Sequence, residues 1–205
     1  MVANPKGGCG KSTLAVHLAS WFAQHDEIVY LGDLDRQQSS RYWLETRPAS
    51  LAPIRHWEIT EDEFVLPPKN SHVDFAILDT PAGLHGKRLK QVLNEVDKVV
   101  VPVSPSRFDM LATRDFFEEL AETKAVRKER VDIGVVGMRV DVRTQVFAQL
   151  IEFLQQFDLP VVTCIAQSQR YLQAVDTGVT LFDRNSDTKL IDTQWRPLLD
   201  WIVSR

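Results

Sequence analysis

The sequence predicts an α/β fold in which a parallel, or mostly parallel, β-sheet is flanked by helices on both faces. Short apolar runs alternate along the chain with longer segments in which apolar residues recur every three or four positions. The short runs are apolar throughout rather than at every second position, as in Phe75-Ala76-Ile77-Leu78. Strands of this kind are buried on both faces, which is typical of parallel sheets covered by helices.

The expected elements follow one another along the whole chain. Leu14, Leu18 and Phe22 fall on one face of the first expected helix, as in a helix that packs on a sheet. The expected strand at 75–78 runs directly into Asp79. We expect helices at residues 11–24, 39–45, 87–96, 110–126, 144–157, 170–176 and 192–203, and strands at residues 28–31, 54–59, 75–78, 98–103, 131–136 and 161–165.

The bulk composition fits one globular domain, which we expect to span residues 1–205. The formal net charge of −4 argues against a protein that binds nucleic acid over its whole surface, so any such contact needs a local basic patch. The two cysteines, Cys9 and Cys164, form neither a disulfide framework nor a metal-ligand spacing, which fits a reducing cytoplasm.

The segment N-P-K-G-G-C-G-K-S-T, from Asn4 to Thr13, is typical of a phosphate-binding loop. Its end fits the pattern G-x-x-x-x-G-K-[ST], although Pro5 stands where the first glycine of that pattern falls. Glycines let backbone N–H groups approach phosphate oxygens, and the start of the next helix adds positive partial charge. We expect Lys11 to reach the β- and γ-phosphates, Ser12 to ligate Mg²⁺, and the loop as a whole to bind nucleotide through Gly7, Gly8, Cys9, Gly10, Lys11, Ser12 and Thr13. This loop makes the expected fold similar to that of P-loop NTPases.

A second lysine, Lys6, precedes Lys11 by five residues. It cannot easily serve the same phosphates from the same chain. Its position therefore indicates a role in trans, in which Lys6 of one protomer acts on the nucleotide of its partner in a dimer.

Aspartates stand at the ends of two expected strands. Asp79 ends the strand at 75–78, while Asp33 and Asp35 follow the strand at 28–31. The carboxyl ends of strands border the crevice where open α/β sheets bind ligands, and carboxylates there can hold Mg²⁺. The alternative is that these acids begin ordinary turns, but the phosphate-binding loop favours a metal site.

The loop resembles the deviant Walker A motif, K-G-G-x-G-K-[ST], of the ParA/MinD superfamily of dimerising ATPases. The segment D-L-D-R-Q is similar to the D-x-D-P-Q of ParA proteins, with Arg36 in place of the usual proline. Residues 102–109, 165–171 and 181–187 resemble stretches of short ParF-type partition proteins, so the resemblance covers nearly the whole chain.

The resemblance implies roles for these residues. Lys6, Lys11 and Asp35 are the expected catalytic residues, with Lys6 acting across the dimer and Asp35 orienting the attacking water. Ser12, Asp33 and Asp79 are the expected metal ligands, and ATP and Mg²⁺ the expected cofactors. Arg143 and Arg170 match arginines that contact nonspecific DNA in the family, although exposed arginines are most often simply solvated.

We therefore expect an ATPase, weak alone and stimulated by a partner, that forms a homodimer with ATP and binds nonspecific DNA of the nucleoid in the cytoplasm. A ParB-like protein or cargo adaptor would trigger hydrolysis, and the cargo would be a plasmid, a chromosome or a protein assembly such as a carboxysome. The alternatives are a MinD-like ATPase on the membrane and a metabolic P-loop ligase. Acidic residues in the last expected helix favour packing on the sheet over membrane binding.

Only three residues, Met1 to Ala3, precede the loop, which is short for the strand that should anchor it. We expect Met1 to lie inside a longer reading frame, the alternative being that a short strand suffices.

Overall fold

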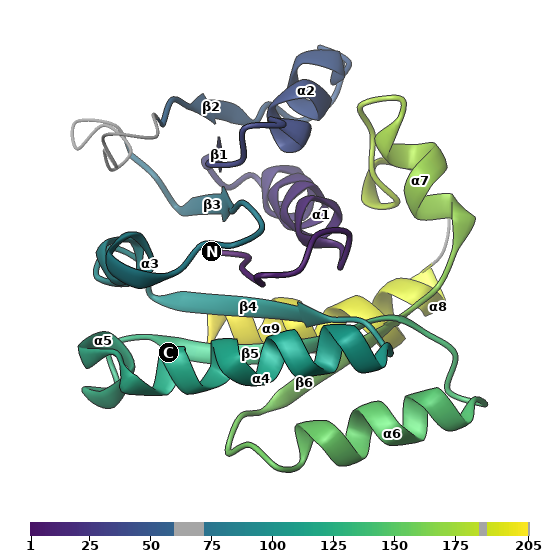
Figure 1. Cartoon of the computed structure of the whole chain (residues 1–205). Helices are drawn as coiled ribbons and strands as arrows, with labels where there is room; N and C mark the ends of the chain where they lie inside the picture. Colours follow the sequence, from purple (N-terminus) through teal and green to yellow (C-terminus); the bar gives the residue numbers. More distant parts are fainter. Residues whose placement is uncertain (60–71, 185–187, 205) are drawn as a thin grey trace. The chain divides into compact units, whose positions relative to one another are not determined.

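The computed structural model of the chain describes residues 1–59, 72–184 and 188–204 (Figure 1). The last part of the resemblance at 181–187 therefore lies outside the described residues. The chain forms two compact units. The first unit comprises Met1–Val2, Lys11–Pro81 and Ser168–Thr188, and the second comprises Ala3–Gly10, Ala82–Gln167 and Lys189–Arg205. The chain passes from the second unit to the first between Gly10 and Lys11, inside the predicted phosphate-binding loop.

The first unit is built on a three-stranded parallel sheet in the order β2-β1-β3. Its strands are β1 (Val29–Asp33), β2 (Arg55–Trp57) and β3 (Phe75–Asp79). Pairing of β1 with β3 aligns Asp33 with Asp79, so the two acids end neighbouring strands. The helices of this unit are α1 (Lys11–Gln24), α2 (Ser39–Thr46) and α7 (Gln169–Val175), followed by a 3₁₀ turn at Phe182–Arg184.

Helix α1 packs on this sheet through the apolar face that the sequence predicts. Leu14, Leu18 and Phe22 are buried, and the Phe22 ring stacks on Phe75 of β3 at a centroid distance of 3.7 Å. A Cβ on Gly32 of β1 would lie 2.5 Å from the Ile59 side chain and 2.8 Å from the Trp57 ring, so a larger residue there would force these side chains to shift. Burial of this apolar surface is the main source of stability in the first unit.

A buried polar network ties the chain between Thr180 and Asp183 to α1 and α2. The Arg47 guanidinium at the end of α2 binds both carboxylate oxygens of Asp183, at 3.0 and 2.8 Å. Asp183 also accepts hydrogen bonds from Ser20 and Gln24 of α1, and from Thr180. Burial disfavours the charged form of Asp183, but Arg47 and Thr180 outweigh it and hold its pKa below the usual value.

Replacing Asp183 with alanine should lower the free energy of unfolding by about 3–5 kcal/mol, because it leaves the Arg47 charge buried without a partner. The side chains of Arg47 and Asp183 are only 4% and 1% exposed. Urea denaturation measures the loss. Glu45→Ala, which breaks the exposed Arg41–Glu45 pair, is the control and should change stability by less than about 1 kcal/mol. Equal losses of unfolding free energy in the two variants would contradict a stabilising role for the buried Arg47–Asp183 pair.

The second unit is built on another three-stranded parallel sheet, in the order β4-β5-β6. Its strands are β4 (Lys98–Val103), β5 (Asp132–Val140) and β6 (Val161–Ala166). Within this unit, α4 lies in front of the strands and α9 behind them (Figure 1). The helical segments are α3 (Gly86–Leu93), α4 (Arg107–Glu122), α5 (Lys124–Arg127), α6 (Gln145–Leu154), a π-helical turn at Ile191–Trp195 and α9 (Arg196–Val203), while α8 (Thr188–Leu190) begins at the last residue of the first unit.

The strand pairings of both sheets are parallel and helices pack on the strands, which confirms the predicted fold class. The bounds of α1 and β4 agree with the prediction. Other predicted bounds are wrong. The helices expected at 87–96 and 144–157 each end three residues early, at Leu93 and Leu154, and the strand expected at 54–59 covers only Arg55–Trp57. The expected helix at 110–126 is two helices, because Thr123 is extended (φ −73°, ψ 144°) and its hydroxyl donates to the Leu120 carbonyl. Strand β5 continues to Val140, since β6 pairs with it that far, and the last helix begins as a π-helical turn.

The C-terminal helical segment packs on the sheet of its own unit, as the sequence predicts. Trp195, Leu198 and Leu199 are buried. The Gln194 carbonyl accepts a hydrogen bond from Thr163 of β6, and its side chain accepts one from the backbone of Ala166. None of the described helices has the length and apolar character that crossing a bilayer requires.

Candidate functional site

The first half of the loop, in the second unit, is fixed by Asn4. This side chain is buried, and its amide donates to the Pro102 carbonyl at 2.8 Å and to the Thr113 hydroxyl at 3.1 Å. Its oxygen accepts the backbone N–H of Lys6 at 2.8 Å. Asn4 thus joins the start of the loop to the end of β4 and to α4. No local sequence pattern predicts this role for Asn4, because its partners lie about a hundred residues away.

Two glycines of the loop adopt conformations that other residues rarely reach. Gly8 has φ +75° and Gly10 has φ +101°, both in the left-handed region. A Cβ on Gly10 would also lie 2.7 Å from the Met138 side chain. Cys9 is buried between them and its thiol donates to the Lys6 carbonyl at 3.3 Å, so it has a packing role in the loop.

The second half of the loop begins α1 in the first unit. Lys11 is the first residue of the helix and is buried, while Ser12 is half-buried. Lys11 and Ser12 both influence the charge on Asp79, so the three side chains belong to one cluster. The structure therefore brings together Lys11, Ser12 and Asp79, and their roles in binding phosphate and metal stay predictions.

Asp79 carries a buried carboxylate with no hydrogen-bond partner. Among the buried side-chain polar atoms of the described residues, its two oxygens alone lack one. Burial raises the pKa of Asp79 to about 7, while the nearby hydroxyls of Ser12 and Ser40, though not hydrogen-bonded to it, favour the charged form. A buried, unpaired carboxylate beside a serine hydroxyl is a donor set that suits a hard divalent cation such as Mg²⁺.

Asp33, which pairs with Asp79 across the sheet, accepts several hydrogen bonds. One carboxylate oxygen accepts the backbone N–H of Asp35 at 2.9 Å. The other accepts the backbone N–H and the hydroxyl of Ser40, at 3.0 and 2.8 Å, and the N–H of Arg41 at 3.2 Å. Asp33 therefore caps α2 from outside the helix. Its predicted role as a metal ligand stays a prediction, and the cap is a function that the sequence did not reveal.

Asp35 lies in the turn between β1 and α2. Its side chain is half-buried and accepts the N–H of Gln37 at 3.0 Å, and its carbonyl accepts the N–H of Gln38 at the same distance. The turn therefore places the Asp35 carboxylate two residues after Asp33. Its catalytic role stays a prediction, as does that of Lys6, which is half-buried in the loop.

The two predicted DNA-contacting arginines lie in different units, Arg170 at the exposed start of α7 and Arg143 before α6. The Arg143 side chain is 85% exposed but forms a two-pronged ion pair with Asp141, at 2.9 and 2.8 Å. This pairing lowers the pKa of Asp141 to about 2, so its negative charge stays beside Arg143 at neutral pH. The local positive charge at Arg143 is therefore weaker than the sequence indicates.

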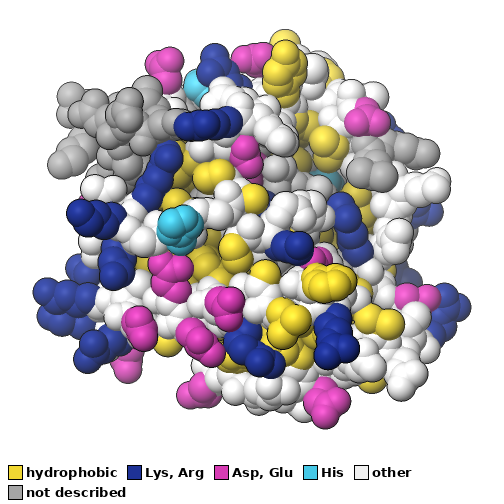
Figure 2. All heavy atoms as spheres, in the orientation of Figure 1, with side chains coloured by type: hydrophobic (Ala, Val, Ile, Leu, Met, Phe, Trp, Pro, Cys, Tyr) yellow, Lys and Arg dark blue, Asp and Glu magenta, His cyan; other side chains and the backbone are white. Residues whose placement is uncertain are grey.

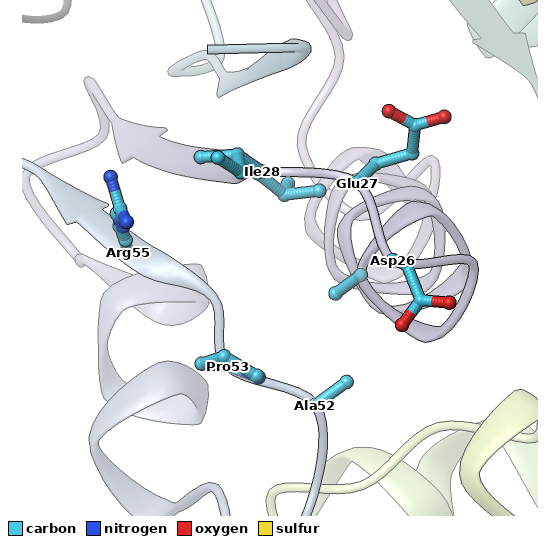
Figure 3. A pocket seen from close by; sticks show the side chains of 8 residues that line it. Asp26, Glu27, Ile28, Ala52, Pro53 and Arg55 are labelled. Atoms are coloured by element: carbon cyan, nitrogen blue, oxygen red, sulfur yellow. The ribbon is translucent and has the colours of Figure 1, made fainter. Parts of the chain in front are cut away.

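The first unit also has a hollow of about 320 Å³, which is not lined by Asp33, Asp35 or Asp79. Asp26, Glu27, Ala52, Pro53 and Arg55 border it (Figure 3). It opens at the amino ends of β1 and β2, whereas Asp33 and Asp79 stand at the carboxyl ends of β1 and β3. The described residues contain no group of three or more acidic, histidine or cysteine side chains able to hold a metal.

The chain belongs to the CbiA family, the CobQ/CobB/MinD/ParA nucleotide-binding domain, which its residues 1–181 match. The matched region contains the loop, Asp33, Asp35 and Asp79. This assignment confirms the resemblance to the ParA/MinD superfamily.

Similar proteins agree with this assignment. Maintenance of carboxysome distribution protein A of Halothiobacillus neapolitanus is 25% identical over 185 residues, which cover 88% of this chain and 85% of that protein. The fold is similar to apo McdA of Cyanthece, with a TM-score of 0.72 and 16% identity over 99% of this chain and 98% of that one. It is also similar to a plasmid partition protein of Borrelia burgdorferi, with a TM-score of 0.63 and 19% identity over 86% and 94% of the two chains.

Asp79→Asn should stabilise the metal-free protein, because it removes a buried charge that has no partner. The melting temperature at pH 8 should rise by several degrees, since 1 kcal/mol corresponds to about 2–4 °C in a protein of this size. Adding Mg²⁺ to the nucleotide-bound protein should raise the melting temperature of the wild type further but not that of the variant. Asp35→Asn, which alters a half-exposed carboxylate, should keep the Mg²⁺ response. An unchanged Mg²⁺ response in Asp79→Asn would exclude the assigned metal site.

Proposed function

We propose that this protein is a ParA-type ATPase that dimerises with ATP, binds nonspecific DNA and positions a cargo together with a ParB-like partner or cargo adaptor. The observation that carries the proposal is the loop from Lys6 to Ser12, with its two lysines, together with the buried, unpaired Asp79. Membership of the CobQ/CobB/MinD/ParA family supports nucleotide binding. The relative named for carboxysome distribution supports a positioning role. The proposed location is the cytoplasm, on the nucleoid.

In this proposal each residue of the site has a separate role in ATP hydrolysis. Lys11 and the loop N–H groups would bind the phosphates, and Ser12 and Asp79 would hold Mg²⁺. The metal supplies neutralisation of phosphate charge. Asp35 would position the attacking water, and Lys6 would act on the nucleotide of the partner protomer. Phosphoryl transfer depends mainly on such positioning and on charge stabilisation, so these side chains suffice for the reaction class.

Lys6→Ala should bind ATP as a monomer but fail to form the ATP dimer, and turnover should fall at least tenfold. The reason is that Lys6 serves the partner's nucleotide rather than its own. Calorimetry measures ATP binding, and light scattering with a slowly hydrolysed ATP analogue measures dimerisation.

Lys11→Ala is the control, because it removes the cation that binds the phosphates within the protomer and should abolish ATP binding itself. Wild-type dimerisation and turnover in Lys6→Ala would reject the role in trans. Loss of ATP binding in both variants would show that the two lysines serve the same phosphates.

DNA binding requires a local basic surface on this acidic protein. Arg143 and Arg170 are the proposed contacts, although Asp141 partly neutralises Arg143. Figure 2 shows a second gathering of Lys and Arg side chains over α3 and α5. Helix α3, helix α5 and the residues just after α5 carry seven cations, which we call the α3–α5 surface: Lys87, Arg88, Lys90, Lys124, Arg127, Lys128 and Arg130.

DNA affinity should depend on ATP, and its logarithm should fall linearly with the logarithm of salt concentration, by roughly 0.9 for each phosphate contacted. Arg143→Ala should reduce that slope by about one contact, and Asp141→Asn should strengthen binding because it frees Arg143. Gel shifts at several salt concentrations, with ATP and with ADP, measure these effects. A triple alanine variant at Lys124, Arg127 and Lys128 is the comparison. If only the triple variant lost DNA binding, the DNA contacts would lie on the α3–α5 surface and not at Arg143 and Arg170. Equal DNA binding with ADP and with ATP would reject DNA-tethered positioning.

The alternatives receive less support. A MinD-like membrane ATPase would need an amphipathic segment available to lipid, and the last helix instead buries Leu198 and Leu199 in its own unit. A metabolic P-loop ligase of the same family would need a substrate pocket, and the hollow of Figure 3 lies at the opposite ends of the strands from Asp33 and Asp79. Pelleting with liposomes and ATP separates the first alternative from the proposal.

A further inference from the structure

Strand β5 contains a residue whose backbone is in the left-handed region. Arg139 has φ 56°, although it lies inside the strand, one residue before its end. The other described non-glycine residues with positive φ lie in turns or directly before a helix, and they are Asp26, Gln38 and Glu129. A left-handed backbone is unfavourable for a residue with a Cβ, so Arg139 is a strained position within a strand.

The strain belongs to a β-bulge between β5 and β6. In this parallel ladder Met138 pairs with Ile165 and Val140 pairs with Ala166, so Arg139 is an extra residue that β6 does not match. Glycine is the usual residue at a bulge whose extra residue is left-handed, because it takes that conformation without strain. This chain has arginine there instead. Bulges are common next to active sites, where they turn a side chain out of the regular ladder.

Contacts within the protein do not account for an arginine at this bulge. Met138 and Val140 are buried, whereas the Arg139 side chain is exposed. Its guanidinium has no hydrogen bond or ion pair with any of the described residues, unlike that of Arg143, which is paired with Asp141. Glycine would hold the same backbone with less strain. The guanidinium of Arg139 is therefore available to a ligand.

The bulge lies next to the phosphate-binding loop. The Met138 side chain packs so closely on Gly10 that a Cβ on this glycine would lie 2.7 Å from it. Arg139 follows Met138 at the carboxyl end of β5, and open α/β sheets bind ligands at this end of their strands. Gly10, Met138 and Arg139 belong to the same unit. A nucleotide at the loop would offer anionic phosphates and a planar base, and a guanidinium can pair with the first or stack on the second.

We propose that Arg139 is a nucleotide-binding residue, and that the bulge directs its guanidinium to the nucleotide held by the loop. The inference rests on the proposed function only in that the loop binds nucleotide. Dimerisation, DNA binding and a partner protein are not needed for it. The strained backbone is then the structural cost of placing a cation beside the loop, and the gain is affinity for the nucleotide.

Calorimetry and thermal unfolding of three variants provide the test. Arg139→Gly removes the guanidinium and keeps a backbone that glycine adopts readily. Arg139→Asn is the second variant, because asparagine also tolerates the left-handed region. Glu129→Gly is the matched control, since Glu129 has φ 52° in the same unit, in the turn after α5. Each protein is titrated, with Mg²⁺ present, with a slowly hydrolysed ATP analogue, with ADP and with inorganic triphosphate.

Affinity for the ATP analogue should fall about tenfold or more in Arg139→Gly and Arg139→Asn, because a charged or stacked contact is lost. It should change by less than about twofold in Glu129→Gly. Without ligand, both glycine variants should melt within roughly 2 °C of the wild type, since relief of strain offsets the extra freedom of glycine in the unfolded chain. A loss that extends to inorganic triphosphate would place the guanidinium on the phosphates, and a loss for both nucleotides alone would place it on the base.

Wild-type nucleotide affinity in the two Arg139 variants would overturn the inference, and so would an equal loss in Glu129→Gly. It would also be overturned if both Arg139 variants melted far below Glu129→Gly, because the arginine would then serve the fold. Failure of the proposed function has a different signature. The wild type would not dimerise with ATP or bind DNA, while the dependence of nucleotide affinity on Arg139 would remain.

Discussion

The charge on Asp79 is the constraint on which the rest of the site depends. Folding places this carboxylate at the end of a buried strand, beside Asp33 on the neighbouring strand, and leaves both of its oxygens without a donor. An apolar residue of similar size would be more favourable for folding alone. The proposed binding of a cation by Asp79 would offset this cost. The nearby Ser12 hydroxyl and Lys11 ammonium define where phosphate and metal would meet.

The two neighbouring acids show how environment separates side chains of the same type. Asp33 receives four hydrogen bonds, three of them from backbone N–H groups, so its negative charge is satisfied by the protein itself. Asp79 receives none, and burial raises its pKa to about 7. The first is suited to holding structure and the second to binding a ligand. Both are aspartates at strand ends, and the donors supplied by α2 and by the backbone of Asp35 distinguish them.

The sequence predicts the local features of this protein well and the long-range ones poorly. Periodicity and the glycine-lysine pattern suffice for α1, β4 and the loop, because these depend on neighbouring residues. Asn4 bonds to residues 98 and 109 positions away, and Arg47 to one 136 positions away, so no local pattern reveals them. The break at Thr123 and the extension of β5 likewise depend on hydrogen bonds and strand pairing rather than on composition.

Helix α2 shows how these long-range contacts bear on the chemistry. With eight residues it is too short to be stable alone, so its ends must be held by the rest of the unit. Asp33 holds the N-terminus, while at the other end Arg47 binds Asp183 and Gly178 packs against the Thr46 carbonyl. With both ends of α2 fixed, residues 34–38 form a short connection between β1 and the helix. Asp35 lies in that connection and donates its backbone N–H to Asp33, so the contacts that hold α2 also hold the segment that carries this carboxylate.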